Sequence, residues 1–202
     1  MQMPYLTIIA GCNGAGKSTF APSFLPESLA SFDYDKLFLE YYNNLPDSEF
    51  REKIAKNKAT ETFEQVLKKT LRNKTDFCYE TNFDAYPVYW VEKFRENGFT
   101  VNLIFFCLES QEIARHRIQV RTEFKGHFVD NTTIDLKWKA GYKNLNAYYA
   151  YFDNILVVDN SKPNDVYTNI LQLEKGKLTL MADPIPVYIK HRLPDIFKLI
   201  NK

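Results

Sequence analysis

The sequence has almost no excess of charge of either sign. Its 202 residues include 26 lysines and arginines and 25 aspartates and glutamates, which gives a net charge of +1. A protein dedicated to binding nucleic acid or an acidic membrane normally carries a basic excess. The balance therefore argues against both classes.

Cysteines and long apolar runs are also scarce. The three cysteines, Cys12, Cys78 and Cys107, each lie in or beside a predicted strand, and no pair has the spacing of metal ligands. We predict that they are small buried side chains in a reducing compartment. No apolar run approaches bilayer length, and the first residues lack a leader-like pattern. We expect a cytoplasmic protein that binds neither membrane nor nucleic acid.

Apolar residues make up 45% of the sequence, and they fall into short strand-like runs that alternate with helical patterns. This alternation predicts an α/β fold, a three-layer αβα sandwich with a mostly parallel sheet. The predicted strands are Leu6–Ala10, Asp76–Glu80, Val101–Leu108 and Ile155–Val158, with a possible short strand at Ser31–Tyr34. The predicted helices are Lys17–Leu25, Asp35–Tyr42, about 50–73, Tyr86–Asn97, Gln111–Arg121 and one that opens at Asn131 or Thr132.

The C-terminal part follows another pattern. Tyr167–Glu174 and Lys177–Met181 alternate in polarity around Lys175-Gly176, which predicts an antiparallel hairpin. A short helix is expected from Pro194 to Asn201. We expect one domain over residues 1–202, with a core at about 5–160 and the hairpin and helix at 163–202.

Glycine is scarce, with only seven residues in the chain, yet three of the seven lie within six positions. Residues 11–18 read GCNGAGKS, which fits the P-loop pattern G-x-x-x-x-G-K-[ST] and follows a predicted strand. Such a loop lets backbone N–H groups surround phosphates, while the lysine contacts the β/γ oxygens and the serine ligates Mg²⁺. A simple tight turn would not require Lys17-Ser18-Thr19 at this offset. We predict a P-loop NTPase or kinase fold that binds ATP and Mg²⁺ through Gly11, Asn13, Gly14, Ala15, Gly16, Lys17, Ser18 and Thr19.

Carboxylates follow two further predicted strands. Asp33 and Asp35 come after the possible strand at Ser31–Tyr34, where a kinase needs a group to deprotonate its acceptor or hold the metal. Capping of a helix is the alternative use of such an aspartate. Glu80-Thr81-Asn82 ends the next strand, where these residues suit substrate hydroxyls or simply mark a polar loop.

Cationic side chains cluster on one predicted helix and just beyond it. Arg115, Arg117 and Arg121 lie on that helix, and His127 follows Gly126. One of these arginines would stabilise a transferring phosphate if the helix end folds over the nucleotide. A solvated surface helix is the alternative, and His127 alone would be an ordinary surface or packing histidine.

Taken in order, these segments resemble the zeta-toxin family of P-loop kinases. GCNGAGKST resembles the family's opening, DYDKL stands at its asparagine-x-aspartate, and FCYETNF resembles its E-T-T segment. RTEFKGHFVDNTTIDLKWKAGYKNL resembles its arginine, glycine-histidine and arginine-aromatic helix, and VVDNS resembles its last strand and turn. The likeness covers about Leu6 to Met181, the tail hairpin included.

The resemblance implies a role for each matching residue. Lys17, Ser18 and the loop would bind ATP and Mg²⁺, Asp35 would be the base that acts on a sugar hydroxyl, and Arg121 would stabilise the γ-phosphate. Glu80, Thr81 and Asn82 would hold the acceptor. Characterised toxins of the family phosphorylate UDP-N-acetylglucosamine and are commonly silenced by a small helical antitoxin that covers the nucleotide site.

The sequence also departs from the family pattern. Asp33 replaces the asparagine, Asn82 the second threonine, Lys125 a glycine, and Lys137 the second arginine. Lysine lacks the bidentate fork of arginine. Lys137, and the lack of a clear apolar strand that ends in a Walker B aspartate, would suit a nucleotide-binding switch or slow NTPase. A kinase of another small alcohol is a further alternative, and the neutral charge disfavours a polynucleotide kinase.

Overall fold

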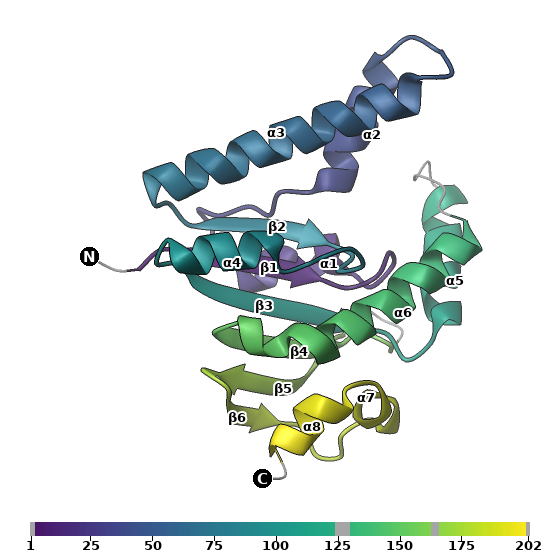
Figure 1. Ribbon diagram of the computed structural model, residues 1–202. Helices are drawn as coiled ribbons and strands as arrows, with labels where there is room; N and C mark the ends of the chain where they lie inside the picture. Colours follow the sequence, from purple (N-terminus) through teal and green to yellow (C-terminus); the bar gives the residue numbers. More distant parts are fainter. Residues whose placement is uncertain (1–2, 124–129, 163–165, 201–202) are drawn as a thin grey trace.

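The computed structural model describes residues 3–123, 130–162 and 166–200. The helices and strands follow one another as an alternating series up to β4 and then as a hairpin with two short helices (Figure 1). They are β1 (Tyr5–Ala10), α1 (Lys17–Phe20), the 3₁₀ helix η1 (Ala21–Phe24), α2 (Tyr34–Asn44), α3 (Arg51–Asn73), β2 (Phe77–Thr81), α4 (Tyr89–Glu96), β3 (Thr100–Cys107), α5 (Gln111–Glu123), α6 (Asn131–Tyr148), η2 (Tyr149–Tyr151), β4 (Asn154–Asp159), β5 (Thr168–Glu174), β6 (Lys177–Met181), α7 (Val187–Arg192) and α8 (Pro194–Ile200).

One sheet of six strands forms the centre, in the order β2-β1-β3-β4-β5-β6. The strands β1 to β4 pair in parallel, whereas β5 and β6 are antiparallel to their neighbours. Parallel strands joined by helices are the expected product of the alternating sequence pattern. The predicted mostly parallel sheet with a C-terminal hairpin is therefore confirmed.

The sheet is covered by helices on both faces. Successive residues of β3 point to opposite faces, as a strand requires. Phe105 packs against Tyr142 of α6, with ring centroids 5.6 Å apart, whereas Phe106 packs against Phe24 of η1 at 5.8 Å. Figure 1 shows α4 and α6 together across one face, with α1 behind the sheet. This is the predicted three-layer arrangement.

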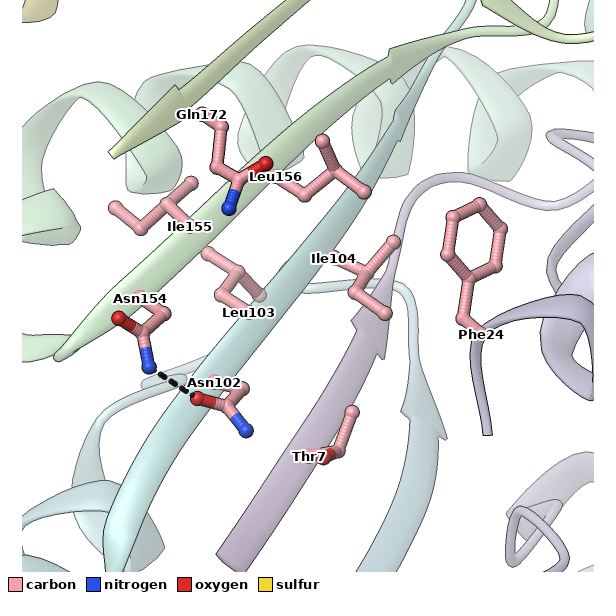
Figure 2. A pocket seen from close by; sticks show the side chains of 9 residues that line it. All are labelled: Thr7, Phe24, Asn102, Leu103, Ile104, Asn154, Ile155, Leu156 and Gln172. Atoms are coloured by element: carbon pink, nitrogen blue, oxygen red, sulfur yellow. Dashed lines mark hydrogen bonds between the residues drawn. The ribbon is translucent and has the colours of Figure 1, made fainter. Parts of the chain in front are cut away.

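An open hollow of about 210 Å³ lies on the η1 face of the sheet. Figure 2 shows Phe24 at its rim, and the amide of Asn154 donates a hydrogen bond to Asn102 Oδ1 at 2.8 Å within it. Its other lining residues are Thr7, Leu103, Ile104, Ile155, Leu156 and Gln172. None of the predicted site residues lines this hollow.

Two local predictions were wrong. The helix expected over Lys17–Leu25 ends at Phe20 and is replaced by η1, which has Pro22 in its first turn. Proline lacks the N–H that would continue the α-helical bonding. The possible strand at Ser31–Tyr34 is only a single bridge, between Phe32 and Tyr79.

The C-terminal helices pack against α6 and β4. The guanidinium of Arg192 in α7 lies 3.9 Å from the ring centroid of Trp138 in α6. The hydroxyl of Tyr188 donates a hydrogen bond to Asp159 Oδ1 at 2.7 Å, and Asn146 Nδ2 donates one to Asp195 Oδ2 at 2.6 Å. Within the described ranges, no helix combines the length and apolar character needed to cross a bilayer.

Candidate active site

The glycine-rich loop of residues 11–16 joins β1 to α1. At Gly11 and Gly16, backbone conformation and close contacts explain why the residue is glycine. Gly11 and Gly16 have φ angles of 142° and 93°, which L side chains rarely adopt. A Cβ on Gly11 would lie 2.6 Å from the carbonyl oxygen of Phe106, and one on Gly16 would lie 2.4 Å from Asn160 Nδ2. The loop therefore packs closely against the backbone of β3 and against Asn160, directly after β4, and both positions favour glycine.

Neighbouring elements hold the loop in place. The amide Nδ2 of Asn160, directly after β4, donates a hydrogen bond to the carbonyl of Ala15 at 2.9 Å, and Asn160 is only 2% exposed. Arg117 of α5 reaches the carbonyl of Gly14 at 3.4 Å. Asn13 Oδ1 is buried and has no hydrogen-bond partner among the described residues. Asn160 and Arg117 thus hold the loop through its carbonyl groups, and the side-chain oxygen of Asn13 remains available to accept a hydrogen bond.

The ammonium of Lys17 is enclosed by oxygen atoms. It donates hydrogen bonds to the carbonyls of Gly11 at 2.8 Å and Cys12 at 3.2 Å, and to Asn82 Oδ1 at 3.3 Å. Burial is the main cause that lowers the pKa of Lys17, and the charge of Lys137 adds to it. The negative charges of Asp35 and Glu80 oppose this shift. Asp35, Glu80 and Lys137 therefore all lie within electrostatic range of Lys17.

A carboxylate at the end of β2 meets the hydroxyl at the start of α1. Ser18 Oγ donates a hydrogen bond to Glu80 Oε2 at 2.7 Å, and Glu80 is 8% exposed. Glu80 lies beside β1, because its register partner there is Ile9. Glu80 thus lies at the end of an apolar strand directly beside the strand that leads into the P-loop. Sequence analysis looked for an aspartate at such a position and considered Glu80 only as an acceptor-binding residue. The signal was present in FCYE, an apolar strand that ends in glutamate.

The aspartate that does end an apolar strand faces elsewhere. Asp159 closes β4, and its Oδ1 accepts hydrogen bonds from the backbone N–H of Ser161 at 2.9 Å and from Tyr188. It therefore links the strand to α7.

The two aspartates before α2 have different surroundings. Asp33 is the N-cap of α2, and its Oδ1 accepts a hydrogen bond from the backbone N–H of Lys36 at 3.0 Å. Asp35 is the second residue of the helix, and its side chain is exposed. The capping role proposed as the alternative for these aspartates thus belongs to Asp33. Thr81 serves the local turn, because its Oγ1 accepts a hydrogen bond from the N–H of Phe83 at 3.1 Å.

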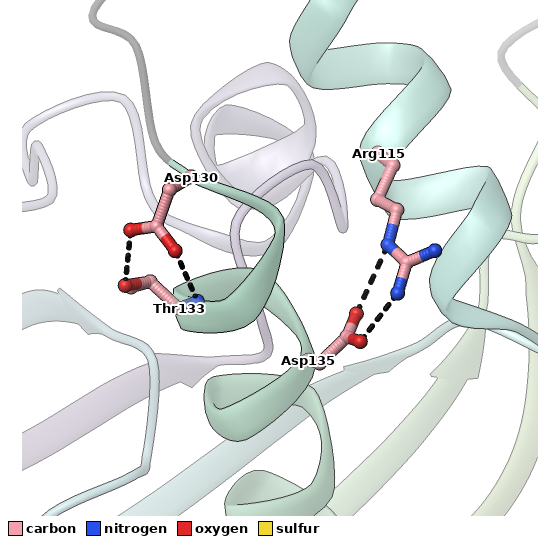
Figure 3. A network of polar contacts seen from close by, with 4 residues as sticks. All are labelled: Arg115, Asp130, Thr133 and Asp135. Carbon is pink, nitrogen blue, oxygen red and sulfur yellow. Dashed lines mark hydrogen bonds and ion pairs between the residues drawn. The ribbon is translucent and has the colours of Figure 1, made fainter.

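The predicted cationic residues separate into three groups. Arg115 is paired with Asp135 of α6, next to the Asp130 cap that receives the N–H of Thr133 (Figure 3). Arg117 contacts the loop, as described above, and the carbonyl of Lys162 at 3.2 Å. The side chain of Arg121, at the end of α5, and the whole of His127 lie outside the described residues.

The donor atoms at Ser18 and Glu80 fit a magnesium ion that arrives with a nucleotide. Mg²⁺ in such sites takes one or two protein oxygens and completes its shell with phosphate oxygens and water. In the part of the chain that the structure describes, no three His, Cys, Asp or Glu side chains gather as a metal cluster. The site therefore has the donors of a metal–nucleotide site and lacks those of a closed protein cage.

Comparison with known proteins identifies the family of the chain. The family model for zeta toxin matches residues 1–172. The structure of the PezAT chromosomal toxin–antitoxin system of Streptococcus pneumoniae is 16% identical, with a TM-score of 0.67 over 100% of this chain and 87% of that chain. A putative kinase of Chloroflexus aurantiacus is 19% identical, with a TM-score of 0.59 over 82% and 92% of the two chains.

A third similar structure is a chain of the AvrRxo1-ORF1:-ORF2 complex with ATP, which is 11% identical, with a TM-score of 0.67 over 88% of this chain and 60% of that one. No curated protein sequence matches. At these identities the solved structures establish the fold alone, whereas the family model spans most of the chain. The chain belongs to the zeta toxin family and is a P-loop phosphotransferase.

Proposed function

We propose that the protein is an ATP-dependent small-molecule kinase that transfers the γ-phosphate of ATP to a hydroxyl of a nucleotide sugar such as UDP-N-acetylglucosamine. The observation that carries this proposal is the hydrogen bond between Ser18 and Glu80 beside the enclosed ammonium of Lys17. It supports the assignment of a metal-binding hydroxyl, its carboxylate partner and a phosphate-binding cation at one end of β1 and β2.

Lys17 and the loop are assigned to ATP. The lysine ammonium binds the β- and γ-phosphate oxygens in exchange for its present carbonyl acceptors, and the loop N–H groups bind the β-phosphate. A charge-assisted bond to phosphate is stronger than one to a neutral carbonyl. The lowered pKa of Lys17 supports this assignment, because an anionic ligand relieves the enclosure of its positive charge.

Ser18 and Glu80 are assigned to Mg²⁺. Because the hydroxyl of Ser18 donates a hydrogen bond to Glu80, a lone pair of Ser18 Oγ remains available to the ion. When bound, Mg²⁺ neutralises charge that develops on the β- and γ-phosphate oxygens. This assignment weighs against the alternative of a nucleotide switch, which rested on Lys137 and on the lack of a Walker B aspartate.

Asp35 is assigned as the general base. Its exposed carboxylate accepts the proton of the acceptor hydroxyl while that oxygen bonds to the γ-phosphorus and the bond from phosphorus to the β–γ bridging oxygen of ATP breaks. ADP leaves with the bridging oxygen. Arg121, Arg117, Lys137 and His127 remain proposed sources of positive charge around the transferred group.

The acceptor and the partner rest on resemblance. Glu80, Thr81 and Asn82 were predicted to hold the acceptor, and Asn82 remains a candidate although it also faces Lys17. The nucleotide-sugar acceptor is the one implied by the family. Similarity to a toxin–antitoxin structure supports the proposal that a small helical antitoxin covers the nucleotide site.

The test is phosphate transfer by the purified protein. It is incubated with ATP, Mg²⁺ and UDP-N-acetylglucosamine, and in parallel with a metabolite mixture, and products are detected as a mass gain of one phosphate. We expect Asp35→Ala to bind ATP and to lose transfer, and Lys17→Ala to lose both. The control is Asp47→Ala, because Asp47 is 97% exposed. Transfer by Asp35→Ala at the parent rate would contradict the assigned base.

A further inference from the structure

The carboxylate of Glu80 is held by two serine hydroxyls, one on each oxygen. Ser18 Oγ donates to Oε2 at 2.7 Å, and Ser31 Oγ donates to Oε1 at 2.7 Å. The role proposed above uses only Ser18. We propose that Ser31 is a positioning residue that fixes the carboxylate of Glu80 for the Mg²⁺ ion accompanying the nucleotide. This inference rests on the proposed function.

Backbone pairing brings Ser31 to this position. The N–H of Phe32 donates to the carbonyl of Cys78 at 2.8 Å, and the N–H of Glu80 donates to the carbonyl of Phe32 at 2.9 Å. These two bonds form the isolated parallel bridge beside β2. The ring of Phe32 also packs against Phe63 of α3, with centroids 5.2 Å apart. Ser31 is therefore anchored next to Glu80 by its following residue.

The same short segment connects the metal site to the proposed base. Ser31 binds Glu80, Asp33 caps α2, and Asp35 lies in the first turn of that helix. A change in the hydrogen bond between Ser31 and Glu80 would therefore affect both the proposed metal site at Glu80 and the proposed base Asp35.

A glutamate needs more support here than an aspartate would. Its side chain has one more rotatable bond, so fixing it costs more conformational entropy. Hydrogen bonds to an ionised carboxylate are among the stronger ones in proteins. With both oxygens occupied, the plane of the carboxylate is fixed, and Oε2 stays directed at Ser18. Without the Ser31 hydroxyl, the carboxylate can rotate about its Cγ–Cδ bond and lose its hydrogen bond to Ser18.

A purely structural role for Ser31 makes a different prediction. If the hydroxyl only attached residues 31–33 to β2, its loss would lower the melting temperature and weaken nucleotide binding equally with and without Mg²⁺. If Ser31 positions the metal carboxylate, its loss changes only the Mg²⁺-dependent part of binding. The two roles are therefore separable by titration of the metal.

The experiment measures binding of the non-hydrolysable analogue β,γ-imido-ATP by calorimetry, in EDTA and over a series of Mg²⁺ concentrations. For Ser31→Ala we expect the Mg²⁺ concentration at half-effect to rise roughly 10- to 100-fold, which is usual when a group supporting a metal ligand is lost. Affinity in EDTA should stay at the parent value. Ser31→Thr keeps a hydroxyl and should restore the parent Mg²⁺ dependence, and Ser48→Ala, at an exposed serine, is the control.

The outcomes separate this inference from the proposed function. A parent-like Mg²⁺ dependence of Ser31→Ala, or equal weakening in EDTA and in Mg²⁺, overturns the role of Ser31 alone. If Ser31→Ala shifts the Mg²⁺ dependence while the parent protein transfers no phosphate, the kinase proposal is overturned and the role of Ser31 is supported. A parent protein that binds no nucleotide overturns both.

Discussion

Removal of the Asn160 side chain tests whether the end of β4 holds the nucleotide loop. In the folded protein Asn160 is 2% exposed, and its amide donates to the carbonyl of Ala15 at 2.9 Å. Asn160→Ala leaves that carbonyl without its donor, which costs about 1–3 kcal/mol for a buried group. Asn160 Oδ1 is itself buried and finds no hydrogen-bond partner in residues 3–123, 130–162 and 166–200, so its removal offsets part of the cost. We expect about 1–2 kcal/mol, a fall in melting temperature of roughly 2–8 °C for a chain of this size.

The same substitution should weaken nucleotide binding. Ala15 lies inside the loop, and a loop that must be ordered by the ligand binds with an affinity lower by the ordering cost. A loss of about 1.4 kcal/mol corresponds to roughly tenfold in the dissociation constant for Mg-ATP. Calorimetric titration measures the affinity, and a thermal melt without nucleotide measures the stability.

Asn154→Ala is the matched control, at the other end of the same strand. Its amide donates to Asn102 Oδ1 at 2.8 Å beside the hollow on the η1 face. We expect a small loss of stability and parent affinity for Mg-ATP. Parent-like nucleotide binding by Asn160→Ala, or equal weakening by Asn154→Ala, would refute the view that Asn160 holds the loop.

Two further predictions concern buried or shielded cations. Because enclosure lowers the pKa of Lys17, the folded chain binds this proton less tightly than the unfolded chain, and stability rises as pH approaches the unfolded value of ~10.4. The melting temperature of the nucleotide-free parent, relative to Lys17→Met, should therefore increase between neutral and alkaline pH; a difference that shrinks would contradict the assigned cause. Arg192→Leu removes the cation above Trp138, worth about 0.5–2 kcal/mol, and should lower the melting temperature by roughly 1–8 °C. Lys198→Ala, at an exposed ion pair, should melt like the parent, and an equal fall in both variants would exclude a specific role for Arg192.

The fold was largely predictable, because its main signals are local. The almost unbroken apolar run of β3 and the helical spacing of apolar residues in α3 identified both elements to within one or two residues. The break at Pro22 was underestimated. A proline is tolerated in the first turn of a helix, but Pro22 would fall in the second turn of a helix that began at Lys17, and it stands instead in the first turn of η1. α7 was missed, because six residues that end in Lys190-His191-Arg192 are too short to show a periodicity.

The site was predictable only where its residues are neighbours in sequence. The loop motif is contiguous, so its glycines and Lys17 were found directly. The bonds from Ser18 to Glu80 and from Asn160 to Ala15 join residues 62 and 145 positions apart. They depend on which strands lie beside β1, and local sequence patterns do not predict the order of strands in the sheet. Arg115 was considered as a residue that could stabilise phosphate, because it lies close in sequence to other arginines. In the structure its guanidinium is paired with Asp135 of α6.

The most direct test of the account is calorimetric titration of the purified protein with Mg-ATP, accompanied by a thermal melt. We predict saturable binding of one nucleotide per chain and, at a hundredfold excess over the dissociation constant, about 2.7 kcal/mol of stabilisation, or a rise of roughly 5–11 °C in melting temperature. Both effects should vanish in Lys17→Met. A parent protein that gives no heat and melts at the same temperature with and without Mg-ATP would contradict the assignment of residues 11–18 to a nucleotide.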